Sequence, residues 1–444
     1  MMQRHYQSWG QYFRGIQQGI PFLSRHQSLP IQSEQSLTYL PFGNGRSYGD
    51  SCLNNTGKLI DCISLNQIIA FDEDNGLLTC EAGLLLGDII RHCISRGWFI
   101  AVTPGTQFVT LGGAIANDVH GKNHYHAGTF GCHVKAFELL RTDGTRLLCS
   151  GTQNTELFRA TIGGLGLTGV ITWAQIQLKP VSSAFITQEV VKFSNLDEFF
   201  VIDQDSASHF EYSVAWIDCL AKGKNVGRGL YIRANHAQDL PIPKTVRSNR
   251  QLVFPCELRF SLINRFSLKC FNALYYAKQR KKVTRSTVYY ESFFYPLDTV
   301  RYWNRMYGKK GFFQYQCVVP KANAQRNIRQ ILELIAATHT GSFLVVLKSF
   351  GNIKSPGLLS FPQEGYTLAL DFPNQGEPTL ALLERLDKIT IMAKGAVYPA
   401  KDARMSAANF QKYFPQWREL QSYIDPRLSS GFWRRVTQST NHKT

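Results

Sequence analysis

The order of apolar and polar residues along the chain predicts short strands and helices separated by glycine turns. In the first 180 residues, LLTCEAG at 77–83 has the composition of a strand, whereas residues 85–96 carry apolar side chains at helical spacing and stop at Gly97. The segment FELLRTDGTRLLCSG predicts two strands joined at Asp143 and Gly144. Residues 170–179 alternate with period two and lead into Pro180, which predicts a further strand. This is an α+β pattern and not a regular series of βαβ units.

Beyond Pro180 the length and order of the predicted elements change. Longer strands come first, then a basic stretch, then the apolar segments GFFQYQCVVP and FLVVLKSFG. Two amphipathic helices are predicted by apolar residues at helical spacing, namely Ile328, Ile331, Leu332 and Ile335 in one and Leu383, Leu386 and Ile389 in the other. A second α+β domain is therefore expected over about 181–395, and 444 residues suffice for two domains or for one domain split by an insertion.

Composition narrows the class of protein. The chain is 44% hydrophobic and 18% charged, as globular proteins are, and no run of eighteen apolar residues is present that would cross a membrane. The first twenty residues lack an apolar core and a small-residue cleavage site, so we expect a cytoplasmic protein. The ten cysteines show neither a C-x-x-C pair nor regular spacing, which argues against zinc and disulfides and favours buried free thiols.

The net charge of +17 is concentrated in one stretch. Between Lys222 and Arg285 there are fifteen Lys or Arg and two acids, Asp239 and Glu257, so fifteen minus two gives +13 of the total. Such a stretch suits a phosphate backbone, an anionic lipid surface, or simply a solvated loop. Because Phe, Leu and Tyr alternate with the cations near its end, a membrane surface is favoured over nucleic acid.

Glycine-rich segments supply the candidate chemistry. Residues 164–169, GLGLTG, match G-x-G-x-x-G, but a helix-like segment precedes them and a strand follows, which is the reverse of a Rossmann site. PFGNGRSYGD at 41–50 is either an ordinary turn or a nest of backbone N–H groups for an anion. In TPGTQFVTLGGAIANDVHGKNHYHAG, Gly112 and Gly113 allow close approach of a second segment or a flat ligand. The four-residue spacing of His120 and His124 would suit a metal ion only if the segment were a helix. Gly121 and Asn123 disfavour a helix here. No metal site is therefore expected.

Taken together, GNGRSYGD, the PGT…GGAIA-x-D-x-HGKNH segment and GGLGLTG resemble, in order and spacing, the PCMH-type FAD-binding domain of the vanillyl-alcohol-oxidase superfamily. Within it the sequence is most similar to the decaprenylphosphoryl-β-D-ribose 2′-oxidase family, and the likeness continues in EYSVAWIDCL, LDFP and YPAKDAR. The resemblance implies a two-domain fold: an FAD-binding domain over 1–180, an inserted α+β substrate-binding cap over 181–395, and a segment over 396–444 that returns to the first domain.

The resemblance also implies which residues hold the cofactor. Many relatives link the flavin covalently through a histidine at the position of Arg46; arginine cannot form that bond, so FAD is expected to be non-covalent. The implied FAD-contacting residues are Gly43, Asn44, Gly45, Arg46, Ser47, Tyr48, Gly105, Thr106, Gly112, Gly113, Ala114, Asn117, His120, Gly169, Val170 and Tyr398.

For the reaction, the resemblance implies oxidation of a secondary hydroxyl of a sugar, the 2′-OH of a polyprenylphosphoryl-β-D-ribose, with Lys401, His120 and Lys122 as catalytic residues. The implied substrate-binding residues are Trp216, Gln314, Gln316 and Lys348, and the two glutamines share one face of a strand. Actinobacterial relatives have Asn and Cys at Thr367 and Ala369, so the sugar or the lipid can differ here.

Several partners and alternatives accompany this hypothesis. A short-chain NAD(P)H-dependent reductase would complete the epimerisation, and the basic stretch 222–285 would hold the protein at the inner face of the cytoplasmic membrane. An aldonolactone or alditol oxidase of the same superfamily is the alternative enzyme, although that group generally keeps the flavin-linking histidine. The alternatives from a different class are a flavin-free binding protein and a nucleic-acid binder that uses the basic stretch.

Overall fold

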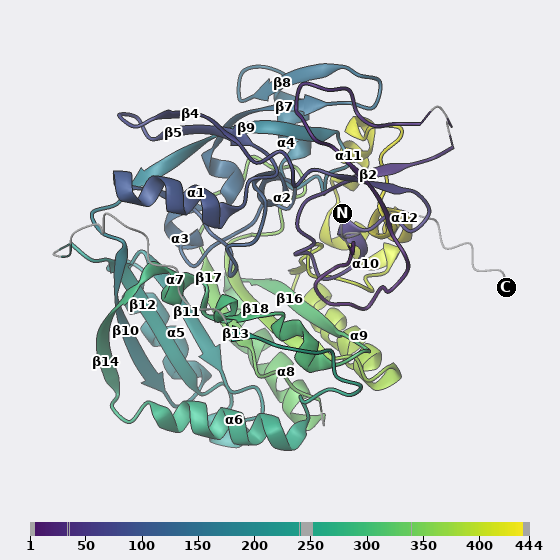
Figure 1. Ribbon diagram of the computed structural model, residues 1–444. Helices are drawn as coiled ribbons and strands as arrows, with labels where there is room; N and C mark the ends of the chain where they lie inside the picture. Colours follow the sequence, from purple (N-terminus) through teal and green to yellow (C-terminus); the bar gives the residue numbers. More distant parts are fainter. Residues whose placement is uncertain are drawn as a thin grey trace.

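The first 180 residues form two sheets (Figure 1). The computed structural model describes residues 5–32, 34, 36–238, 240, 252–338 and 340–437. A three-stranded parallel sheet has the order β1-β3-β2, with β1 Gln18–Pro21, β2 Tyr39–Phe42 and β3 Lys58–Asp61. The second sheet has the order β4-β5-β9-β7-β8, and β6 also pairs with β9. Its strands are β4 Ile68–Asp72, β5 Leu77–Glu81, β6 Trp98–Ile100, β7 Val134–Leu140, β8 Arg146–Ser150 and β9 Val170–Pro180.

The local predictions for this part are confirmed. Helix α1 spans Leu86–Cys93, and a 3-10 turn follows it and ends at Gly97, whose φ of 80° is the left-handed conformation that glycine adopts easily. The turn between β7 and β8 contains Asp143 and Gly144. Around the GLGLTG segment, helix α4 at Thr155–Thr161 comes first and β9 comes after, so a Rossmann loop is excluded here. The remaining helices of this part are α2 Leu111–Ala116 and α3 His124–Ala127.

A single antiparallel sheet forms the centre of the middle region. Its order is β14-β10-β12-β11-β17-β18-β16-β19, with β10 Phe185–Phe193, β11 Tyr212–Ile217, β12 Gly229–His236, β14 Val283–Tyr289, β16 Phe312–Pro320, β17 Val345–Phe350, β18 Gly365–Pro373 and β19 Ala396–Val397. A small parallel pair joins β13 Leu252–Val253 to β15 Val300–Arg301. The helices here are α5 Leu196–Ser206, α6 Arg265–Lys278, α7 Tyr290–Phe294, α8 Ala324–Ala337 and α9 Glu377–Met392, and α8 and α9 confirm the two predicted amphipathic helices. The mixture of helices and sheets confirms the α+β class.

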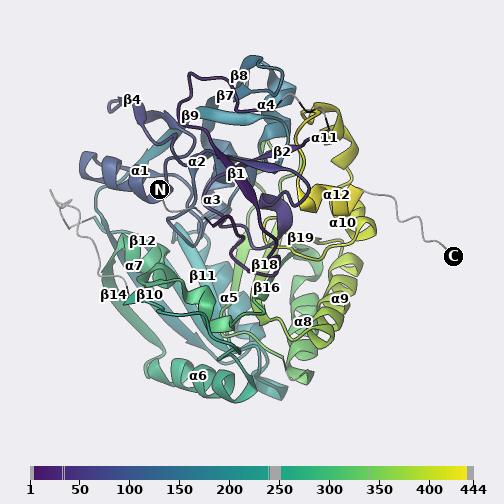
Figure 2. The same cartoon turned by 45° about the vertical axis from the view of Figure 1, so that its right-hand side comes forward.

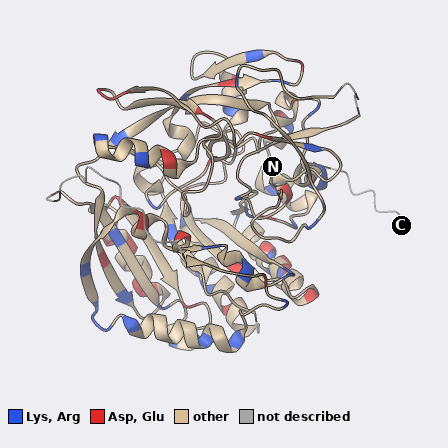
Figure 3. Cartoon of the chain, in the orientation of Figure 1, with Lys and Arg blue, Asp and Glu red and all other residues tan. Residues whose placement is uncertain are grey.

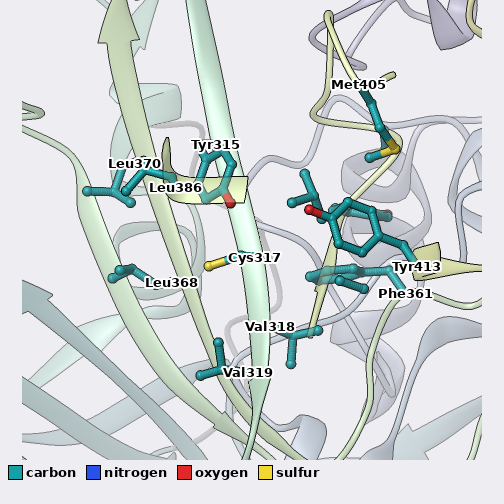
Figure 4. Packing of buried hydrophobic residues seen from close by; sticks show 14 of the residues in the cluster. Tyr315, Cys317, Val318, Val319, Phe361, Leu368, Leu370, Leu386, Met405 and Tyr413 are labelled. Carbon is teal, nitrogen blue, oxygen red and sulfur yellow. The ribbon is translucent and has the colours of Figure 1, made fainter. Parts of the chain in front are cut away.

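Period-two alternation gives the eight-stranded sheet two different faces. On β16 and β18, Tyr315, Cys317, Leu368 and Leu370 point into the main hydrophobic core, where Leu386 of α9 joins them (Figure 4). The residues between them, such as Gln316 and Thr367, line a cavity on the opposite face. The core therefore anchors one side of the sheet, while the other side is free to carry a site.

The C-terminal helices return to the first sheets. Helices α10 Ala407–Tyr413, α11 Trp417–Tyr423 and α12 Gly431–Thr437 lie beside β1 and β2 (Figure 2). Backbone N–H groups of Tyr39 and Gly431 donate to Arg427 and Leu53, and Arg435 forms an ion pair with Asp50. We propose domain boundaries at 180/181 and 395/396, with one addition from the structure: Ala396–Val397 pairs with β16 and extends the sheet of the middle region.

All ten cysteines lie within the described residues and are free thiols. Six are buried, but Cys256 and Cys270 are exposed, so the expectation of buried thiols is wrong for these two. Both belong to the basic stretch, whose surface position leaves their side chains in solvent. In the part of the chain that the structure describes, no helix is long and apolar enough to cross a bilayer.

Candidate active site

A cavity of about 1560 Å³ lies between the first 180 residues and the open face of the eight-stranded sheet. Its walls come from the two glycine-rich loops, from β10, β11, β12 and β16–β18, and from the turn that follows β19. This volume exceeds the roughly 300–1,000 Å³ of a pocket for one drug-sized ligand. The cavity therefore has room for a large cofactor together with a substrate.

The loop at 43–48 has the features of an anion cradle. Among the described residues, none accepts a hydrogen bond from the backbone N–H of Gly45, Arg46 or Ser47, although all three residues line the cavity. A Cβ on Gly43 would lie 2.4 Å from Thr110 Oγ1, so only glycine allows this loop to approach the second one. Free N–H groups in a glycine-rich loop suit a pyrophosphate.

Arg46 supports the same interpretation. Its guanidinium carbon lies 4.3 Å from the ring centroid of Trp9 and 5.2 Å from that of Phe108, and its buried Nε has no hydrogen-bond partner. The backbone N–H of Trp9 donates to Ser47 O over 2.7 Å, which ties the N-terminal segment to the loop. A buried donor without an acceptor is costly, and an anionic cofactor would supply the acceptor. The donor set thus fits FAD.

His120 lies at what we call the polar end of the cavity, whose lining residues are His120, Gln314, Gln316, Lys348 and Lys401. Lys348 Nζ lies 3.0 Å from His120 Nδ1 and donates to Gly121 O over 2.9 Å. Gln316 Nε2 lies 2.9 Å from His120 Nε2 and donates to Thr367 Oγ1 over 3.1 Å. Both ring nitrogens of His120 are therefore engaged, which fixes the orientation of the imidazole.

Burial sets the charges of this group. Desolvation, and then the charge of Lys348, holds the pKa of His120 well below its usual range, so the ring is neutral at pH 7. Desolvation, together with the charges of Lys122 and Lys401, lowers the pKa of Lys348 to about 7. Lys122, whose Nζ donates to Phe294 O over 2.9 Å, has its pKa lowered to about 8 by desolvation. Two lysines beside one imidazole, Lys348 and Lys401, and a third, Lys122, beside Lys348 thus make the site sensitive to pH near neutrality.

Lys401 and Asp371 form a buried pair at the same end. The Lys401 Nζ lies 4.0 Å from the ring centroid of Tyr48, on the cofactor side of the cavity. Burial raises the pKa of Asp371 and lowers that of Lys401, and the charge of each partner opposes the shift of the other. Gln314 Nε2 donates to Asp371 Oδ1 over 2.5 Å, while Oδ2 has no partner.

A second part of the cavity is apolar. We call it the apolar arm, and it consists of Val190, Val214, Trp216, Leu230, Ile232 and Val346 from strands β10, β11, β12 and β17. The indole N–H of Trp216 donates to Phe343 O over 3.1 Å, so the ring has no need of a polar ligand. One cavity therefore combines a polar and an apolar section.

Most of the site residues predicted from the sequence line the cavity. The cavity brings together Gly43 to Tyr48, Gly105, Thr106, Gly112, Gly113, Asn117, His120, Lys122, Gly169, Trp216, Gln314, Gln316, Lys348, Tyr398 and Lys401. Tyr398 is held by its hydroxyl, which donates to Asn117 O over 2.7 Å. Ala114 and Val170, which the resemblance also implies as FAD contacts, are fully buried among apolar side chains and lie outside the cavity lining.

The other histidines of HGKNHYHAG take no part in the polar end. His124 is buried against Phe350, with ring centroids 4.3 Å apart, and neither ring nitrogen has a partner. Desolvation lowers the pKa of its imidazole to about 3. Among the described residues, no group of three His, Cys, Asp or Glu side chains is arranged to hold a metal ion.

Asp371 and the apolar arm, apart from Trp216, were missed by sequence reasoning. The signal for Asp371 was present, because it lies two residues beyond Ala369 in LDFP and hence on the same strand face. Its partner Gln314 follows only from the β16–β18 register. For the arm, no motif marks aliphatic side chains that come together from four strands.

Comparison with known proteins agrees with this geometry. A family model described as "FAD binding domain" matches residues 29–150. Decaprenylphosphoryl-β-D-ribose oxidase of Mycolicibacterium smegmatis is 36% identical over 400 residues, covering 86% of this chain and 85% of that protein. An uncharacterized protein of Streptomyces coelicolor is 32% identical over 344 residues, covering 74% and 93%. D-Arabinono-1,4-lactone oxidase of Eremothecium gossypii is 27% identical over 167 residues, covering 37% and 31%.

The fold, the cavity and the matched domain define a class, the FAD-dependent oxidoreductases with a PCMH-type FAD-binding domain. Two of the three relatives are oxidases of sugar-derived substrates by name, but only the first spans nearly the whole chain. The chain belongs to the decaprenylphosphoryl-β-D-ribose oxidase family.

Proposed function

We propose that this protein oxidises the 2′-hydroxyl of a polyprenylphosphoryl-β-D-ribose to the 2′-keto product, the first step of an epimerisation. The observation that carries this proposal is the continuity of one cavity, which leads from the glycine loops past the polar end into the apolar arm. A substrate that combines a sugar, a phosphate and an isoprenoid chain has the same succession of polar and apolar parts. The similarity to the M. smegmatis oxidase over most of both chains supports it.

In this proposal the loop 43–48, the second loop and Gly169 hold FAD, and bound FAD would supply the electron acceptor for the broken C–H bond. Gln314, Gln316 and Lys348 orient the sugar, and Trp216 contacts the adjoining part of the substrate. His120 is neutral and can accept a proton or hydrogen bond from the hydroxyl when the substrate takes the place of the Gln316 amide at Nε2. The cationic form of Lys401, beside Tyr48, stabilises negative charge that develops on the cofactor side.

FAD is held without a covalent bond in this proposal, because Arg46 occupies the position where many relatives carry the linking histidine. The test is the absorption spectrum of purified protein before and after acid precipitation. Yellow flavin in the supernatant is expected; flavin that stays in the pellet would contradict the non-covalent assignment. A colourless protein that FAD cannot reconstitute would overturn the whole proposal.

The alternative is an aldonolactone oxidase acting on a small soluble lactone. The lactone oxidase match covers only 37% of the chain, and a lactone would leave the apolar arm empty. Anaerobic mixing separates the two functions. Polyprenylphosphoryl-ribose should lower the flavin absorbance almost to that of the fully reduced flavin, whereas D-arabinono-1,4-lactone should leave the absorbance unchanged. Bleaching by the lactone alone would favour the alternative.

A peripheral membrane contact is part of the proposal. Residues 258–285 contain eight Lys or Arg and no acid, and Figure 3 shows cations along α6. Of the basic stretch 222–285, residues 239 and 241–251 lie outside the described structure. Phe266 and Leu274 on α6 are 78% and 72% exposed beside these cations, as insertion into an anionic leaflet requires. The inner face of the cytoplasmic membrane would provide such a leaflet.

Vesicle sedimentation tests this contact. Holoprotein should sediment with phosphatidylglycerol vesicles at low salt and be released at high salt. Phe266→Ser with Leu274→Ser should abolish sedimentation, and Met392→Ser, which removes an apolar side chain that is 75% exposed on α9, is the matched control. Equal sedimentation of all variants would exclude α6 as the contact.

The proposal includes a second enzyme. A 2′-keto sugar must be reduced from the opposite face to complete an epimerisation, and a short-chain NAD(P)H-dependent reductase is the expected partner. Co-incubation of holoprotein, substrate, NADH or NADPH and such a reductase should yield the arabinose epimer. Accumulation of the keto product only would contradict the partnership.

A further inference from the structure

We infer that the apolar arm is the binding site for the first isoprene units of the substrate's lipid chain, and that the chain enters from beneath α6. This inference rests on the proposed function and adds to it the place where the lipid binds. Its first support is the register of the sheet. Leu230 pairs with Trp216, Trp216 with Val346, Val346 with Ala369, and Ala369 with Gln316.

These pairings make one continuous row across five strands. Paired residues of neighbouring strands project from the same face of a sheet, and all five residues line the cavity. The row begins with three large apolar side chains and ends at Gln316, which contacts His120. A ligand lying along this row would have its polar group at His120 and an apolar tail over Trp216 and Leu230.

A second row widens the apolar arm beside the first. Val190 pairs with Ile232, and Ile232 pairs with Val214. The three β-branched side chains line the same cavity and carry neither charge nor hydrogen-bonding group. An apolar surface of this kind stabilises an isoprenoid through the hydrophobic effect, whereas it offers nothing to a second sugar or to a phosphate.

An aromatic path connects the arm to the outside of the protein. The ring of Trp216 meets that of Tyr275 edge-on at 4.7 Å, and Tyr275 stacks on Phe271 at 5.6 Å. Phe271 is exposed, and so is Lys278, which lines the same cavity. Figure 1 shows α6 at the end of the molecule opposite β4, β7 and β8.

The two faces of α6 explain why the entrance is there. Leu268 and Asn272 are buried, and Asn272 Nδ2 donates to Asp218 Oδ1 over 2.7 Å, so this face fastens the helix to the protein. The opposite face exposes Phe266, Cys270 and Leu274 at helical spacing. A helix that is apolar outward and cationic at its edges would lie on a bilayer. A lipid chain could then pass directly from the leaflet into the arm.

Calorimetric titration of FAD-loaded protein tests the arm without turnover. Farnesyl phosphate, which has no sugar to oxidise, and ribose 1-phosphate, which has no lipid, are the two probes. Leu230→Gln places an amide in the arm, and Leu230→Met keeps it apolar at similar volume. We expect Leu230→Gln to weaken farnesyl phosphate binding about tenfold or more, Leu230→Met to bind within about threefold of the wild type, and ribose 1-phosphate binding to be unchanged in both.

The outcomes separate the two hypotheses. Equal affinity of wild type and Leu230→Gln for farnesyl phosphate would overturn the lipid site, as would a parallel loss of both probes, because the arm would then have no preference for the chain. The fluorescence of Trp216 is the difference between the emission of the wild type and that of Trp216→Phe. Farnesyl phosphate should reduce this difference, and an unchanged difference would likewise overturn the lipid site. Failure of the proposed function shows instead as absence of flavin bleaching by polyprenylphosphoryl-ribose, whatever the calorimetry gives.

Discussion

The polar end and the apolar arm of the cavity lie on one face of one sheet, yet they differ in almost every physical property. At the polar end, His120 is held at both ring nitrogens, and the charges of Lys348 and Lys401 act on it. In the arm, Val214 and Leu230 project from neighbouring strands with no polar partner to satisfy. The comparison shows that the sheet supplies only spacing, while the residue type at each register position decides whether a segment of the cavity performs chemistry or binds a chain.

The difference predicts unequal consequences of mutation. A side chain at the polar end stabilises charge that develops in the transition state, and one preorganised group can lower the activation free energy by several kcal/mol. A side chain in the arm contributes to ground-state binding, so its loss should raise KM and leave kcat nearly unchanged. The following substitutions test this contrast.

Lys401→Met should have the largest effect. It removes the cation beside Tyr48 and leaves Asp371 without its charge partner, so we expect the rate of flavin reduction to fall roughly 10²- to 10³-fold. Rapid mixing under anaerobic conditions measures the rate, and the absorption spectrum measures bound FAD, which should persist. Lys412→Met, an exposed lysine of α10, is the control. A Lys401→Met rate within threefold of the wild type would remove this lysine from the chemistry.

His120→Ala should have the next largest effect. The substitution removes the neutral imidazole between Lys348 and Gln316, and loss of a positioned proton acceptor costs about 10²-fold in kcat. FAD content should not change. His126→Ala is a matched control from the same segment, since His126 is exposed. If both variants turn over alike, the histidine at 120 has only a structural role.

Much of the fold could be predicted because its signals are local. The α1 helix with Gly97, the β7–β8 turn and the two amphipathic helices α8 and α9 each follow from residues that are neighbours in sequence. The glycine loops could be predicted for the same reason. A loop that must expose its N–H groups leaves a compact pattern of glycines.

The rest depends on which strands lie side by side. Gln314 meets Asp371 through a pairing of residues 57 apart, and His120 meets Lys348 across 228. The arm is a more extreme case, because valine in a strand has the same pattern whether it faces a core or a cavity. Ala114 and Val170 show the reverse case: they adjoin lining residues in the sequence, but they are buried in the apolar core.

The pH dependence of stability tests whether burial at the polar end removes the charge of Lys348 near neutral pH. Burial lowers the pKa of Lys348 to about 7, while in the unfolded chain it stays near its ordinary value of 10.5. Between these values the unfolded state binds more protons, so raising the pH stabilises the native state. The free energy of unfolding should therefore rise between pH 7 and 9 by about 2 kcal/mol more in the wild type than in Lys348→Met.

Urea unfolding at pH 7, 8 and 9 measures this difference. Lys388→Met, an exposed lysine of α9, should follow the wild type at every pH and so controls for loss of one positive charge. A constant gap between wild type and Lys348→Met across the range would mean that Lys348 keeps its ordinary pKa and stays fully charged, and the polar end would then not be sensitive to pH near neutrality.

Thr367→Val should give the smallest effect and tests the border between the two regions. Thr367 Oγ1 accepts from Gln316 and donates to Cys317 O over 2.9 Å, and it is fully buried beside Ala369. Valine has nearly the same shape but leaves Gln316 with one bond fewer, which costs about 1 kcal/mol of stability. We expect a decrease of that size in urea unfolding and a change of a few-fold in KM for the sugar substrate. Thr187→Val, at an exposed position of β10, should change neither quantity. If Thr367→Val loses kcat as severely as His120→Ala, the polar end extends one strand further toward the arm, and the amide of Gln316 acts in the chemistry and not only in orienting the sugar.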